Sequence, residues 1–205
     1  MEQEKSTRSR LYLPNSLTWF AFLFLGVSVV PPPTVGQKAP AGLTMHRQQA
    51  GTPNAKGWYD AKSTEGHFSV SLPIPFNDFT VKVKEKDGTE VVSYVIGSTS
   101  KEGFKFSATE MLNGRRTREF DAHAYVEKFK ADKRNTVSNE TLFEVDGHSA
   151  IQFHVSNAQQ SAFMRALVVP PGVLLLIVEY PKRLERDVIS LVKHFFDSLK
   201  IEQIM

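Results

Sequence analysis

The pattern of apolar positions is strongest from Ser161 to Tyr180, where two apolar runs flank Pro170-Pro171-Gly172. The second run, Val173 to Val178, contains no polar residue. Such a run is far shorter than the ~20 residues that span a bilayer, and it is typical of a strand that is buried on both faces. We therefore predict a central hairpin of two strands, which the rest of the folded chain covers.

Several shorter segments before this hairpin also have strand patterns. In Gly66 to Pro73, the apolar residues Phe68, Val70 and Leu72 alternate with serines, which is typical of a half-buried strand. Further strands are predicted at residues 79–85, 91–96, 104–109, 137–145 and 148–156. Because the turns between neighbouring strands are short, such as Asp146-Gly147, the sheet is expected to be antiparallel.

Two segments have the periodicity of amphipathic helices. The first begins after Asp121, a suitable N-cap, and extends to about Arg134. The second covers Leu184 to Leu199 and has a wide apolar stripe. If the last strand of the hairpin is apolar on both faces, each face of the sheet needs a helix. The predicted fold class is therefore α+β, an antiparallel sheet with amphipathic helices packed on both faces, as an α/β/α sandwich.

Residues 1–30 have the organisation of a signal peptide or an uncleaved signal anchor. Lys5, Arg8 and Arg10 precede the uncharged apolar run from Leu17 to Val30. Polar and Pro-rich sequence isolates this run on both sides, which disfavours a buried core helix. The basic flank predicts a cytoplasmic N-terminus and an extracytoplasmic domain. Ala39-Pro40-Ala41 has small residues at cleavage spacing but lies far beyond the run, so both cleavage and retention stay open.

The segment that follows predicts the limits of the folded domain. Residues 31–57 are rich in Pro, Gly, Ala, Gln and Thr and have no periodicity, which is typical of a disordered linker. A single domain is then expected over residues 58–205, a length within the range of ~100–200 residues for one domain.

Composition and charge exclude several classes of function. The chain has no cysteine, which excludes disulfides, thiolate catalysis and zinc sites built on cysteine. The formal net charge is +3, but residues 1–41 hold four basic and two acidic residues. The remainder has 21 basic and 20 acidic residues and is nearly neutral. Since nucleic-acid binding needs concentrated positive charge, we do not expect nucleic acid as a partner.

The best candidate site in the sequence is a cluster of three arginines, Arg115, Arg116 and Arg118, in a predicted loop from Met111 to Glu119. Three guanidinium groups on one loop could hold a carboxylate or a phosphate through charge-assisted hydrogen bonds. A solvated loop with local ion pairs is the alternative.

Other candidate chemistry has weaker support. No phosphate-binding loop and no nucleophile elbow occur in the chain. We therefore predict no catalytic residue and no cofactor. The six histidines lack metal-ligand spacing and are expected to be solvated or structurally hydrogen-bonded, so no metal site is predicted either. Glu179 directly follows the apolar strand, and we expect it to mark the point where that strand emerges from the core.

The order of these elements resembles the PsbP-like, or Mog1/PsbP, sandwich domains. The resemblance covers residues 57–201. Its motifs are Trp58-Tyr59, the run Glu65 to Val70 leading into Leu72-Pro73, and the closing Phe195 to Leu199. These are packing and turn motifs, and the family supplies no active-site motif to transfer. By analogy, the resemblance implies a binding or accessory role.

The functional expectation is an exported or membrane-anchored, non-catalytic binding or accessory domain. Its partner is expected to be a protein or a small ligand, and it would contact the membrane only through residues 17–30, if these are retained. One alternative is an enzyme whose site is assembled from separated residues in a cleft. A second alternative is a cytosolic partner-binding factor of the Mog1 type.

Overall fold

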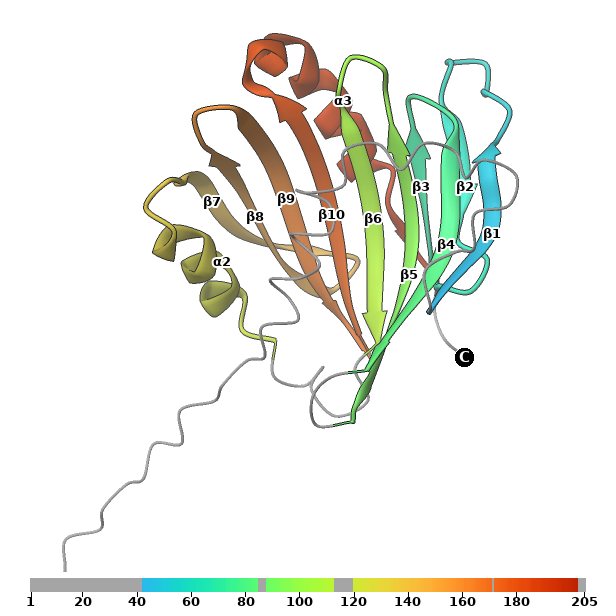
Figure 1. Cartoon of the computed structure of the whole chain (residues 1–205), viewed down its shortest axis with the longest axis horizontal. Coiled ribbons are helices and arrows are strands. Elements are labelled where there is room, and N and C mark those ends of the chain that lie inside the picture. Colours follow the sequence, from blue (N-terminus) through green and yellow to red (C-terminus); the bar gives the residue numbers. More distant parts are fainter. Residues whose placement is uncertain (1–41, 85–87, 113–119, 171, 203–205) are drawn as a thin grey trace, which may run out of the picture. The chain divides into compact units, whose positions relative to one another are not determined.

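The computed structural model describes residues 42–84, 88–112, 120–170 and 172–202, whose strands form two antiparallel sheets. The large sheet has the strand order β1-β4-β5-β6-β10-β9-β8-β7 (Figure 1). Its strands are β1 (Leu43–Ala50), β4 (Phe76–Lys84), β5 (Glu90–Thr99), β6 (Lys105–Leu112), β7 (Thr136–Val145), β8 (His148–Ser156), β9 (Gln160–Val169) and β10 (Gly172–Pro181). The small sheet has the order β11 (Lys200–Ile201), β3 (Phe68–Leu72) and β2 (Tyr59–Lys62).

The predicted central hairpin is present as β9 and β10. Strand β10 lies between β6 and β9, so that Leu176 is opposite both Ala108 and Arg165. Every residue from Val173 to Val178 is buried except Ile177, which is half-buried. An interior position explains this composition because both faces of the strand are removed from water.

Two helices and a short 3-10 turn occur among the described residues. Helix α2 (Ala122–Ala131) begins after Asp121, whose side chain accepts a hydrogen bond from the Ala124 backbone N–H, as predicted for the N-cap. Helix α3 (Glu185–Asp197) follows the 3-10 turn η2 (Lys182–Leu184).

The two helices contact different strands. Helix α3 packs against β10, β9 and the small-sheet strand β3, whereas α2 packs against β7 and β8. Figure 1 shows α2 beside the end of the large sheet that β7 forms. Helix α3 contributes its buried residues Val188, Val192, Phe195 and Phe196 to the main core.

The prediction of a disordered linker over residues 31–57 is wrong where strand β1 lies. Residues 31–41 of that predicted linker lie outside the described residues. Strand β1 pairs with β4 and places Leu43 opposite Val81. It forms an edge of the sheet, and all of its side chains are half-buried or exposed, including Met45 at 43%. Backbone hydrogen bonds hold an edge strand without requiring apolar alternation, so the sequence pattern gave no strand signal here. The folded part of the chain accordingly begins before Trp58 and includes β1.

The remaining differences concern short elements and element ends. Strands β2 and β11 have four and two residues and were not predicted. Strand β6 continues through Met111 and Leu112, which the prediction placed in a loop. Helix α2 ends at Ala131 rather than near Arg134. Asp132 follows as C-cap and binds Arg134 through its side chain, which ends the helix one turn early.

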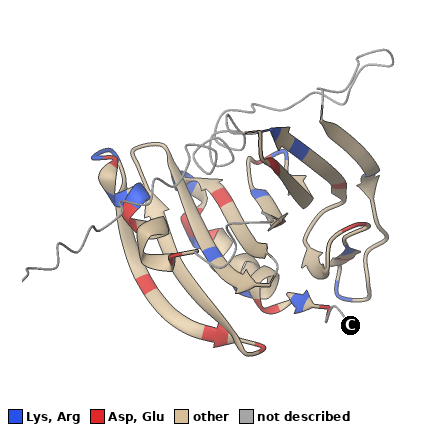
Figure 2. Cartoon of the chain, turned by 90° about the horizontal axis from the view of Figure 1, so that it is seen from below, with Lys and Arg blue, Asp and Glu red and all other residues tan. Residues whose placement is uncertain are grey.

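The described part of the chain also bears on the membrane and charge expectations. None of the helices in that part combines the length and apolarity that a membrane span requires. The predicted signal segment, residues 1–30, lies outside the described residues. Figure 2 shows basic and acidic residues interspersed over the described strands and helices.

Candidate functional site

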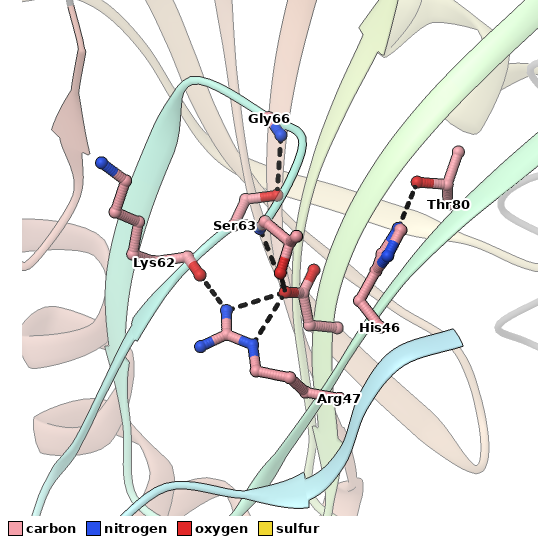
Figure 3. Close-up of polar contacts among 8 residues, drawn as sticks. His46, Arg47, Lys62, Ser63, Gly66 and Thr80 are labelled. Carbon is pink, nitrogen blue, oxygen red and sulfur yellow. Dashed lines mark hydrogen bonds and ion pairs between the residues drawn. The ribbon is translucent and has the colours of Figure 1, made fainter. Parts of the chain in front are cut away.

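A buried polar cluster lies where the loop between β2 and β3 crosses the large sheet (Figure 3). At its centre is Asp78 of β4, which is 1% exposed. Its Oδ2 accepts hydrogen bonds from Arg47 Nη2 at 2.7 Å and Nε at 3.0 Å. The same oxygen accepts from Thr64 Oγ1 at 2.6 Å and from the Thr64 backbone N–H at 3.1 Å. Asp78 therefore joins strand β1, strand β4 and the β2–β3 loop.

Arg47 and His46 extend this cluster along β1. The Arg47 guanidinium also donates to the Lys62 carbonyl oxygen at the end of β2, and it lies 5.0 Å above the centre of the Phe76 ring. His46 Nε2 lies 2.8 Å from Thr80 Oγ1 on β4. Both side chains thus connect the edge strand to its neighbours, and these contacts explain why a polar strand is fixed in place.

A second buried carboxylate, Glu110 of β6, binds the end of the same loop. It is 3% exposed, and its Oε2 accepts from the His67 backbone N–H at 2.7 Å. Its Oε1 lies 3.1 Å from His67 Nδ1. Tyr94 is the cross-strand neighbour of Glu110 on β5. Burial, with the charges of Glu110 and Glu65, raises the pKa of the Tyr94 phenol.

Gly66 allows the loop to approach Glu110 closely. Its backbone N–H donates to Ser63 Oγ at 3.0 Å. A Cβ atom at this position would lie 2.8 Å from Glu110 Oε2 and 2.9 Å from both Ser63 Oγ and a ring carbon of Phe68. Real Cβ atoms essentially never show such contacts, so a larger residue here would have to displace Glu110, Ser63 or Phe68.

The arrangement of His67 and Glu110 has one feature of a catalytic site. A carboxylate that orients an imidazole is the arrangement that supports a general base. The His67 side chain is 37% exposed, so its other ring nitrogen can reach solvent. Among the described residues, however, the hydrogen bonds of this pair include no serine or threonine hydroxyl at the imidazole. No group of three metal-ligating side chains is found there either. The two contacts of Glu110 with His67 fasten the loop to the sheet.

The predicted anion-binding loop, with Arg115, Arg116 and Arg118, lies outside the described residues. The carboxylates and the arginine of the buried cluster, Asp78, Glu110 and Arg47, were not singled out from the sequence. A signal for two of them is present: Asp78 has the same strand parity as Phe76 and Thr80, and Glu110 the same parity as Phe106 and Ala108. A charged residue at an inward position indicates a buried partner.

Most of the histidines make structural contacts. His123 Nδ1 lies 3.4 Å from Glu140 Oε1, and the His194 ring stacks on Trp58 with centroids 3.8 Å apart. His154 is buried between two hydroxyl groups, Ser138 Oγ and Tyr180 Oη. The expectation was solvated or structurally hydrogen-bonded histidines; His123 and His154 have polar contacts of this kind, whereas His194 is held by ring stacking.

Glu179 does not mark an exposed strand end. It is 7% exposed on β10, and one of its carboxylate oxygens lies 3.7 Å from Lys105 Nζ on β6. Burial raises the pKa of Glu179 to about 7, although the Lys105 ammonium acts in the opposite direction. A carboxyl group of this kind changes its charge near neutral pH.

The motifs that carry the family resemblance meet in space. Trp58, which begins the first motif, stacks on His194 of α3. The Ser71 backbone N–H on β3 donates to Ser198 Oγ at 2.8 Å. Strand β11, which follows α3, pairs with β3 through Lys200 and Ser69. The segment after Trp58 and the C-terminal segment of the domain are therefore joined in the small sheet, and the motifs act in packing.

Comparisons with known proteins give similarities of fold. The chain is similar to cyanobacterial PsbP (CyanoP) from Synechocystis sp. PCC 6803, with a TM-score of 0.46 and 11% identity over 75% of this chain and 98% of that chain. It is also similar to LpqN, involved in cell envelope biogenesis of Mycobacterium tuberculosis, with a TM-score of 0.38 and 12% identity over 80% and 87% of the two chains. No protein family and no curated protein matches the sequence.

Proposed function

We propose that this protein is an exported or membrane-anchored, non-catalytic binding or accessory domain. The proposal rests on the hydrogen bonds that two buried carboxylates accept. The Oδ2 atom of Asp78 and both carboxylate oxygens of Glu110 accept hydrogen bonds that hold the β2–β3 loop. The two buried carboxylates therefore serve to hold the loop in place, which favours a role in binding through the surface.

The proposed location rests on the sequence of residues 1–30. Basic residues precede the uncharged apolar run from Leu17 to Val30, which is the arrangement that directs the following chain across a membrane. We infer that the domain is extracytoplasmic, in the periplasm, secreted, or held at the membrane with the domain outside. Residues 17–30 would supply the only membrane contact, and only if they are retained.

We also infer that the two helices lie on opposite faces of the large sheet. The supporting contacts involve β8 and β9, in which Phe153 is opposite Met164 and Gln152 is opposite Arg165. Tyr125 and Phe129 of α2 pack on the Phe153 ring, with centroids 6.0 and 5.5 Å apart. On α3, the Phe196 carbonyl accepts from Arg165. Helix α2 thus contacts Phe153 of β8, and α3 contacts Arg165, which is the cross-strand partner of Gln152. Because the consecutive residues Gln152 and Phe153 point to opposite faces of the sheet, these contacts favour the α/β/α arrangement.

The location is tested in cells that naturally produce the protein. The full chain carries a C-terminal tag, and protease is added to intact cells or to cells with a permeabilised outer layer. We expect the domain to be digested while a cytosolic marker survives. A matched variant with Phe22→Arg and Leu25→Arg interrupts the apolar run and is expected to leave the domain protected. Protection of the unmodified chain would favour the cytosolic alternative.

The binding role is tested by crosslinking in the same cells. A photoreactive residue replaces an exposed side chain such as Ile189, which is 54% exposed. A discrete crosslinked partner is expected. The control places the same group at Val188, its fully buried neighbour. Crosslinks that are equal at both positions, or absent from a series of exposed positions, would contradict a binding domain.

A further inference from the structure

His154 of β8 is a buried histidine whose two ring nitrogens each contact a hydroxyl group. The residue is 7% exposed. Its Nε2 lies 3.0 Å from Tyr180 Oη on β10, and its Nδ1 lies 3.3 Å from Ser138 Oγ on β7. The ring also packs against Phe163 of β9, with centroids 4.5 Å apart. A single side chain therefore links four neighbouring strands of the large sheet.

The partner Tyr180 stands at the junction between the sheet and α3. It is fully buried, and Pro181, η2 and α3 follow it directly in the chain. Two charged groups from these elements act on His154: Glu185 at the start of α3 favours the protonated ring, and Lys182 of η2 disfavours it. The phenol of Tyr180 stays protonated over the physiological range, since burial raises its pKa to about 12.

The hydroxyl partners suit a neutral imidazole in either tautomer. A hydroxyl group both donates and accepts, so one partner can accept from the ring N–H while the other donates to the unprotonated nitrogen. A protonated ring donates from both nitrogens, and both hydroxyls must then accept. The Tyr180 O–H then has to turn from the ring to another acceptor, such as the buried Ser161 hydroxyl. The ring also carries its charge at a buried position beside Phe163.

We propose that His154 is an acid-sensitive latch, and that its protonation loosens the junction at which β10 passes into η2 and α3. Burial lowers the pKa of His154 below its ordinary value of 6.5. The folded state therefore binds the proton less readily than the unfolded state. The stability contributed by the neutral ring is complete above pH 6.5. It is lost as the pH falls from 6.5 through the lowered pKa.

The test follows the His154 ring and the amides of residues 185–190 by NMR in the full chain, between pH 7.5 and 4.5. The His154 ring is expected to titrate below pH 6.5. Amide exchange in the first turns of α3, corrected for its intrinsic pH dependence, is expected to accelerate over the same range. Each pH unit by which the His154 midpoint lies below 6.5 corresponds to about a tenfold loss of protection in wild-type protein.

Variants distinguish the effect of His154 protonation from other effects of low pH on the fold. His154→Gln is expected to abolish the acid-dependent acceleration, whereas His148→Gln on the same strand is expected to retain it. If His154→Gln does not fold, Tyr180→Phe supplies the test: removing the hydroxyl at Nε2 should shift the His154 midpoint, and the acceleration of exchange in α3 should move to the same pH. A His154 midpoint at or above 6.5, or exchange in α3 that ignores that midpoint, overturns the proposal.

Discussion

Replacement of Glu179 by glutamine is expected to change the pH dependence of stability. Glu179 is buried on β10, and Lys105 is its charged neighbour at 3.7 Å. Glutamine has nearly the same shape but cannot ionise. The substitution therefore removes the cost of burying the carboxylate while keeping the packing of the strand.

The expected change in the free energy of unfolding follows from the pKa of Glu179, which burial raises from 4.5 to about 7. Between these two values the folded state holds the proton more tightly than the unfolded state. Stability is therefore lost as the pH rises through this window, and the loss is complete above pH 7. At about 1.4 kcal/mol for each pKa unit, the full effect is about 3 kcal/mol.

The assay is urea unfolding of wild type and Glu179→Gln at pH 4, 5, 6, 7 and 8. The two proteins are expected to have similar stability at pH 4. The variant is expected to become more stable than wild type by up to about 3 kcal/mol at pH 8. Glu144→Gln, at an exposed position of β7, is the control and should follow wild type. Parallel profiles for wild type and Glu179→Gln would refute the reasoning.

Two further substitutions test the contacts that hold the small sheet and α3. Arg165→Met removes hydrogen bonds to Gln152 Oε1 and to the Phe196 carbonyl, and should lower the free energy of unfolding by about 2 kcal/mol in urea titrations. An unchanged urea midpoint for Arg165→Met would contradict this prediction. Gly66→Ala forces a Cβ against Glu110 and should cost about 1–3 kcal/mol in thermal melts. Gly97→Ala, where the nearest atom is 3.5 Å away, should cost clearly less.

The strands and helices that bury side chains were predictable from the sequence. Buried elements need apolar side chains, so their burial is visible in the sequence. Examples are the run Val173 to Val178 and the apolar stripe of the last helix. Strand β1 has no such apolar pattern in its sequence. Its backbone pairs with β4, but its side chains at Thr44 and Met45 are exposed. An edge strand held by backbone bonds and by Arg47 cannot be recognised from apolar periodicity.

The candidate site was less predictable because its members come from distant parts of the chain. Arg47 and Asp78 are 31 residues apart, and His67 and Glu110 are 43 residues apart. Each one has an ordinary sequence environment, and only the sheet register brings them together. The inward parity of Asp78 and Glu110 within their strands was the available signal. It indicates that a partner exists but not which residue provides it.

The buried charges also explain how a small sheet stays attached to a large one. Strands β2, β3 and β11 are short, and short sheets are marginal alone. Asp78 and Glu110 each hold one end of the β2–β3 loop. Arg165 of the large sheet binds the Phe196 carbonyl near the C-terminus of α3. Removing one partner leaves the other charge buried and uncompensated, which costs more than the hydrogen bond itself. The attachment is therefore expected to fail cooperatively, and surface loops outside these contacts remain the parts that can change without loss of the fold.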